Sequence, residues 1–153
     1  MRKKLTVIFT ILMMLVCVMP ATSYAAYGNT MPLSAKGNSE TLIYIKRPES
    51  HSASTSDRTY TISAVGAAGT AIKIYKYNAS SGTCNLIKGT TYIGASGFFS
   101  TVVSLNADNN IFMVYAENSR GASQVTRIDI SKIRQSTVNR LKNVTVTMKN
   151  FLG

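Results

Sequence analysis

Cys84 and His51 are the two side chains of this sequence with the chemistry of a nucleophile and its base. A cysteine reacts as its thiolate, which needs a base or a positive charge held close to the sulfur. His51 lies in a serine-rich stretch, 49–58, that is predicted to be a loop, and no flanking motif fixes its position relative to Cys84. Zinc normally takes several ligands from cysteine, histidine and carboxylates, and one histidine with one cysteine beyond residue 25 is too few. We therefore predict no catalytic, metal or cofactor-binding residues.

The acidic residues are few and scattered. All six lie in turn-like stretches or near the ends of apolar runs: Glu40, Glu49, Asp57, Asp108, Glu117 and Asp129. Glycoside cleavage needs two carboxyl groups at a set separation, and the sequence singles out no such pair. The stretch 106–109 has the composition of a turn and too few oxygen ligands for a calcium loop. The sequence predicts that this protein is not an enzyme, and no small-molecule substrate is identified.

The first 25 residues have the layout of a secretory signal peptide. Basic residues at positions 2–4 precede fifteen residues, 5–19, that carry no charge. Ser23 and Ala25 fit the −3 and −1 positions of a cleavage site, so cleavage is predicted after Ala25. The alternative is an uncleaved anchor, for which the run is short because a bilayer-spanning helix needs about 20 apolar residues. We expect a secreted or cell-surface protein.

The rest of the chain is strongly basic. The sequence has 17 Lys and Arg residues and 6 Asp and Glu residues, and three of the basic residues lie in the predicted signal. Residues 26–153 therefore carry 14 basic and 6 acidic residues, a net charge of +8. Such an excess attracts polyanions over long distances, which favours an anionic cell-wall polymer, a membrane surface or an acidic extracellular partner. Nucleic acid fits the charge but not the compartment. The alternative is that the charge only keeps a small domain soluble.

Beyond residue 40 the sequence is a series of short apolar and β-branched runs bounded by turn residues. These runs cover residues 41–45, 59–65, 71–77, 84–93, 98–105, 110–116 and 124–130. The run 110–116 is strongly apolar, as expected of a central strand. Residues 26–40, which are small and polar, predict a flexible lead-in. No helix-length pattern separates the runs, so the spacing predicts an all-β sandwich or barrel of about seven strands.

Several short motifs follow one another along these strands. The run 60–66 is followed by a Gly69-Thr70 turn and the run 72–75, and later come the runs 94–100 and 114–118 with Gly121. In this order and spacing they resemble the bacterial immunoglobulin-like (Ig-like) domains. The resemblance implies an immunoglobulin-like antiparallel β-sandwich over residues 41–130. Such domains serve as modules of secreted and cell-surface bacterial proteins.

Residues 131–153 form a basic C-terminal segment without an acidic residue. Its basic residues are Lys132, Arg134, Arg140, Lys142 and Lys149. Apolar residues, with Thr137 filling one gap, recur in steps of three and four from Ile130 to Phe151, which favours an amphipathic helix that begins near Ser131. The competing interpretation is an eighth strand, because residues 144–148 also alternate and Val144 and Val146 are β-branched.

Two functions fit this sequence. The first is a secreted, non-enzymatic Ig-like module that associates with the bacterial cell envelope or with an extracellular partner. The second is a protein that binds an anionic membrane or wall polymer through the five basic residues of the C-terminal helix. Basic amphipathic helices adsorb to such surfaces by combining charge with an apolar stripe. The alternative for this stripe is that it packs on an open face of the sandwich.

Overall fold

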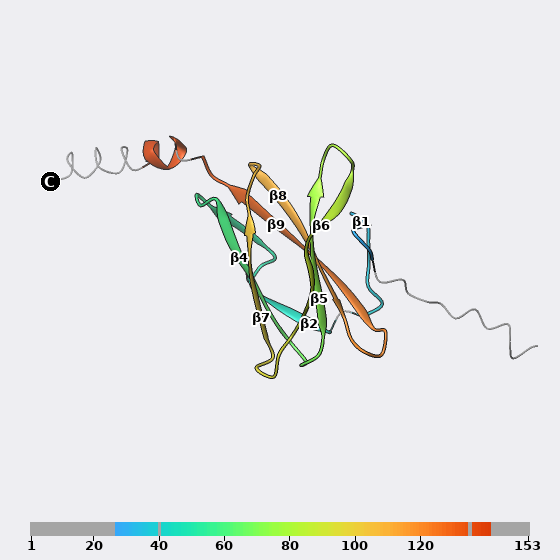
Figure 1. The fold of residues 1–153 in the computed structure, drawn as a ribbon. Helices are drawn as coiled ribbons and strands as arrows, with labels where there is room; N and C mark the ends of the chain where they lie inside the picture. Colours follow the sequence, from blue (N-terminus) through green and yellow to red (C-terminus); the bar gives the residue numbers. More distant parts are fainter. Residues whose placement is uncertain (1–26, 40, 135, 142–153) are drawn as a thin grey trace, which may run out of the picture.

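The computed structural model describes residues 27–39, 41–134 and 136–141, which form two facing β-sheets (Figure 1). Their strands are β1 (Thr30–Pro32), β2 (Ile43–Arg47), β3 (Ser52–Thr55), β4 (Thr59–Gly66), β5 (Ala71–Asn78), β6 (Thr83–Tyr92), β7 (Phe98–Ser104), β8 (Asn109–Glu117) and β9 (Ser123–Lys132). The small sheet has the order β2-β4-β7, and the large sheet has the order β1-β6-β5-β8-β9-β3. The predicted all-β sandwich is confirmed at this level.

The strands run antiparallel to their neighbours in every described pair except one. β3 runs parallel to β9, with Ser52 opposite Asp129 and Thr55 opposite Lys132. β2 and β3 follow each other in the sequence but lie in different sheets, so the chain crosses between the sheets at residues 48–51. It crosses back between β3 and β4, crosses again between β4 and β5, and crosses once on each side of β7.

β8 lies in the middle of the large sheet, between β5 and β9. Its residues Phe112 and Val114 face the small sheet and are completely buried. Met113 and Tyr115 face the other way and are buried as well. A strand covered on both faces is expected to be apolar without interruption. The prediction of a central strand here is therefore confirmed.

The main core fills the space between the two sheets. Alternate residues of the facing strands supply it, because successive side chains of a strand point to opposite faces. From the small sheet it takes Ile43, Ile45, Ile62, Ala64, Phe99 and Val103, and from the large sheet Ile72, Ile74, Phe112, Val114, Ala116, Ile128 and Ile130. At about 25 cal/mol per Å² of buried apolar surface, this interior is the main source of stability for a chain with one described cysteine and no disulfide.

Two polar side chains fix which strands of the two sheets face each other. Gln124 of β9 accepts hydrogen bonds from the backbone N–H groups of Leu42 and Ile43 at 2.8 and 2.9 Å, and its Nε2 donates to the Ile43 carbonyl at 3.1 Å. At the other side, Lys76 Nζ of β5 donates to the Ser104 carbonyl of β7 at 2.8 Å. β2 therefore lies over β9 and β7 lies over β5, which leaves β6 without a strand opposite it.

A second apolar cluster lies on the outer face of the large sheet, beneath the N-terminal segment. Met31 of β1 is buried there against Tyr75, Cys84 and Tyr115. The Tyr75 hydroxyl donates to the Tyr27 carbonyl at 2.8 Å. The rings of Tyr27 and Tyr115 meet edge to face, with centroids 5.7 Å apart. Because the N-terminal segment covers it, the centre of the outer face of the large sheet is apolar.

Residues 27–39 are held against the large sheet, which differs from the flexible lead-in predicted for 26–40. β1 pairs with β6, and at the other end Ser123 N donates to Asn38 Oδ1 at 2.6 Å. Gly37 passes so close to β9 that a Cβ atom would overlap the backbone of Ser123. The composition of this segment gives no strand signal because its pairing depends on one buried side chain, Met31, and on a sheet edge elsewhere in the chain.

All seven predicted runs form strands, with small differences at their ends. The stretch 49–58, expected to be a loop, contains β3, which forms because β9 offers it a partner edge. β9 continues through Ser131 and Lys132, so the prediction of a helix that begins near Ser131 is wrong. Residues 136–141 are helical.

Two predicted features lie outside the described residues. They are the signal peptide, 1–25, and the end of the C-terminal segment, 142–153, with Lys142 and Lys149. The longer amphipathic helix therefore stays a prediction. Within the described parts of the chain, no helix is long and apolar enough to cross a membrane.

Candidate anion-binding site

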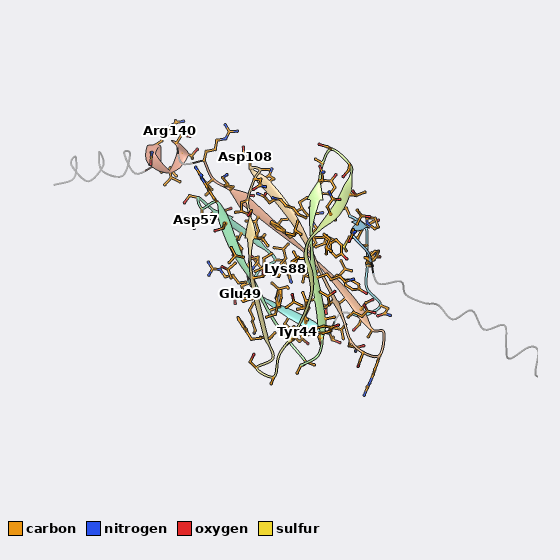
Figure 2. All side chains as sticks on the ribbon, viewed as in Figure 1. Tyr44, Glu49, Asp57, Lys88, Asp108 and Arg140 are labelled. Carbon is orange, nitrogen blue, oxygen red and sulfur yellow. The ribbon has the colours of Figure 1, made fainter. Side chains whose placement is uncertain are left out.

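Basic side chains gather at the end of the sandwich where β7 and β9 finish, which we call the basic end. It is defined by Arg58, Lys76, Lys132, Arg134 and Arg140. Lys132 belongs to β9, and its Nζ donates to the Leu105 carbonyl at 3.2 Å. Leu105 N in turn donates to the Arg58 carbonyl at 2.8 Å, which places the loop before β4 at the same end. Figure 2 shows Arg140 at this end too, together with Asp108 and Asp57.

Arg134 is ion-paired to Asp108 in the loop between β7 and β8. Its Nη2 lies 2.8 Å from the Asp108 Oδ2, and both side chains are more than half exposed. The hydrogen bond that Arg134 donates to this carboxylate raises the pKa of the guanidinium, which stays charged. An exposed pair of this kind is screened by solvent and contributes little to stability. The expectation that no acid opposes the five basic residues is therefore wrong for Arg134, because the opposing acid comes from a distant loop.

Lys76 and Arg58 are the basic side chains of this end that sequence reasoning did not assign to a site, and Lys76 is the more buried of the two. Lys76 lies on the face of β5 that also carries Ile72 and Ile74, so its stem points between the sheets. Its ammonium group lies 5.5 Å from the centre of the Phe112 ring. Burial, and then the positive charge of Lys132, lower the pKa of Lys76. A lysine on the core-facing side of an alternating strand is the sequence signal that could have identified it.

A groove of about 570 Å³ opens beside Lys76, between the β5–β6 hairpin and the β7–β8 loop. Amide side chains line much of it: Asn78, Asn85, Asn106 and Asn109. Tyr77 and Ile87 add apolar surface. Most of the exposed surface of the groove is apolar, and the amides and Lys76 add a few polar groups, so the groove suits a ligand that combines apolar surface with hydroxyl or anionic groups.

The charge of the basic end is positive after its own acids are counted. Five basic side chains stand against two acids, Asp57 and Asp108, an excess of three. Arg58 and Arg140 are exposed, so an anion in solvent can approach them. Ile133 and Leu141 are 38% and 63% exposed, so these two members of the apolar stripe are not core residues of the sandwich.

The candidate nucleophile pair does not assemble. Cys84 lies in β6, whereas His51 directly precedes β3 at the far side of the large sheet. Four strand spacings of about 4.8 Å separate these strands, roughly 19 Å. Cys84 is also fully buried, and burial raises the pKa of its thiol, which opposes the thiolate.

The described acids do not form a site either. Asp129 is bound by Arg127 at 2.9 Å, and Glu117 accepts a hydrogen bond from the Tyr115 hydroxyl at 3.0 Å. The described part of the chain holds no group of three potential metal ligands.

No protein-family model matches the chain, and no curated protein matches it.

Proposed function

We propose that this protein is an exported, non-enzymatic Ig-like module that binds anionic polymer of the cell envelope through its basic end. The Ig-like part of the proposal is supported by the strand order. An Ig-like sandwich divides its strands as A, B, E and D against C, F and G, with C′ and C″ added in the variable type. The order β2-β4-β7 corresponds to A, B and E, the order β6-β5-β8-β9 corresponds to C′, C, F and G, and no described strand corresponds to D. β3 is a second piece of the first strand, paired with β9.

The observation that carries the binding proposal is the basic end itself. Charges from four separate parts of the sequence meet there, beside a groove lined by amides. A polyanion that runs over the basic end would contact Arg58 and Arg140 on the surface and Lys76 at the groove. Such contacts are screened over about 8 Å at physiological ionic strength, so the binding is expected to weaken as salt increases.

Sedimentation with purified cell-wall material, before and after chemical removal of its anionic polymer, tests this proposal. We expect the protein to sediment only with the untreated wall at low salt, and to be released at high salt. Arg140→Gln is expected to lower the bound fraction. The matched control is Arg120→Gln, which removes the same charge from the exposed β8–β9 turn at the opposite end of the sandwich. Equal losses in the two variants, or binding that salt does not change, would contradict the proposal.

The exposed Ile133 and Leu141 favour a second candidate, adsorption to an anionic membrane through the C-terminal segment. Vesicles that contain an acidic phospholipid distinguish the two candidates. A truncation after Arg134 keeps β9 complete and removes the rest of the segment. If the truncated protein loses vesicle binding but keeps wall binding, the basic end of the sandwich binds polymer by itself. If the full-length protein binds vesicles and not wall material, the membrane candidate replaces the polymer.

A further inference from the structure

β7 is an edge strand with an unused row of backbone hydrogen-bonding groups. Gly66 N donates to the Gly97 carbonyl, and Leu105 N donates to the Arg58 carbonyl. In an antiparallel pair the bonded residues alternate, so the odd-numbered residues of β7 turn their backbone groups towards β4. The even-numbered residues, 98–104, turn theirs to the opposite edge of the sheet.

That opposite edge is largely open. Within the described residues, the Ser104 carbonyl accepts the Lys76 ammonium group, and Phe98 N reaches Ser96 Oγ at 3.4 Å. Among the strands that the structure describes, none lies beside the backbone groups of Ser100 and Val102. An open edge of this kind is a template for another strand, and proteins normally cover, charge or shorten it. β7 instead carries Phe98 and Val102, whose side chains are 51% and 64% exposed.

The space next to this edge is also uncovered. β6 has no strand opposite it, and its Ile87, on the core side of the strand, is 46% exposed. The groove of about 570 Å³ lies at one end of this space, with Ile87 and Lys76 in its wall. One additional strand beside β7 would cover Ile87 and extend the small sheet to four strands.

We propose that this place is filled by residues 143–149 of a second copy of the chain. These residues alternate, with Val144, Val146 and Met148 on one side of an extended strand and threonines on the other. Residues 143–149 extend to about 23 Å at 3.3 Å per residue, the length of β7, which also has seven residues. In the added strand the apolar side faces Ile87, and the threonines face solvent beside Ser100 and Val102.

We assign the added strand to a second copy because the described chain leads away from its own sandwich. Arg134 is tied to Asp108 at the end of the sandwich, and the helical residues 136–141 continue away from both sheets (Figure 1). At residue 141 the described chain therefore leads away from its own sandwich. The edge of β7 and the donor segment are different surfaces, so the contact is head to tail, and each copy can both give and receive a strand.

The experiment uses a chain truncated after Leu141 as acceptor, a synthetic peptide of residues 142–153 as donor, and the full-length protein. We expect the truncated protein to be monomeric and to bind the peptide, and the full-length protein to associate as its concentration increases in sedimentation velocity runs. Val146→Asp in the full-length chain should abolish association. Thr145→Asp, on the other side of the same strand, should preserve it. Neither variant changes the five basic residues of the segment, so wall binding can be followed separately.

Ile87→Lys tests the acceptor side. Its side chain is already half exposed, so the sandwich is expected to fold, which circular dichroism checks. Peptide binding should weaken about tenfold or more, because the new charge would be buried under the added strand. The proposal is overturned if the peptide does not bind the truncated protein, or if both aspartate variants associate like the parent. It is also overturned if the full-length protein stays monomeric while the truncated protein binds the peptide, since the chain then fills its own edge.

Discussion

Replacement of Gln124 by leucine tests the link between the two sheets. Gln124 is 9% exposed, and its amide holds β2 by three hydrogen bonds to the backbone of Leu42 and Ile43. Leucine keeps the approximate volume and removes every one of these bonds. The N–H and carbonyl of Ile43, a residue that is 1% exposed, then have no partner in the interior.

Each buried backbone group left without a partner costs about 1–3 kcal/mol, so the loss of two partners should lower the free energy of unfolding by about 2–6 kcal/mol. Leu42 is only partly buried, and water can replace its bond. Urea unfolding of the parent and of Gln124→Leu measures the change through the midpoint at a constant slope. The control is Asn106→Ala, which removes an exposed amide and should change stability by less than about 0.5 kcal/mol. A loss below about 1 kcal/mol for Gln124→Leu would show that the sheets are held together by the core alone.

Three further changes test the core, the N-terminal segment and the outer cluster. Val114→Asp should lower the free energy of unfolding by several kcal/mol, about 3 or more, because it buries an unpaired charge in the central strand; thermal unfolding measures the loss, and an unchanged melting temperature would refute the burial. Gly37→Ala should loosen residues 27–39 from β9, which limited proteolysis followed by mass spectrometry would detect as faster cleavage before β2. Burial raises the pKa of both Tyr75 and Tyr115 in the folded protein, so the stability that their neutral hydroxyls contribute is fully present below the unfolded value of about 10 and is lost as the pH rises above it. Tyr115→Phe should reduce this alkaline loss in urea unfolding curves, and an identical loss in the parent and the variant would contradict the assignment.

A strand can be predicted from the sequence where its own residues alternate or are continuously apolar. β5 and β9 alternate, and β8 is continuously apolar, so their places follow from the burial that each pattern requires. β1 and β3 are short and lack an alternating apolar pattern, and they are strands only because β6 and β9 offer them a partner. No local pattern contains that information, since it depends on which edge remains open after the other strands have paired.

The basic end likewise combines residues that the sequence pattern identified with residues that only the fold brings together. The sequence identified Lys132, Arg134 and Arg140 by their closeness along the chain. Asp108 and Lys76 join them through loops and strands more than twenty residues away, which only the topology determines. The ion pair with Asp108 shows why a count of charges within one segment overestimates the free charge that a ligand would meet.

β9 has a consequence for the order in which the fold can be completed. It is the last strand of the described chain, yet it pairs with β8, pairs with β3 and holds β2 through Gln124, a contact between residues 82 positions apart. A chain emerging from the ribosome or from a membrane channel, N-terminus first, lacks all three connections until residue 124 has appeared. Its earlier strands can pair locally, as β5 does with β6, but the two sheets cannot be joined at that side. Contacts over such long stretches of chain also slow folding. If the chain is exported as proposed, the two sheets would stay unjoined at this side until β9 has passed through the channel.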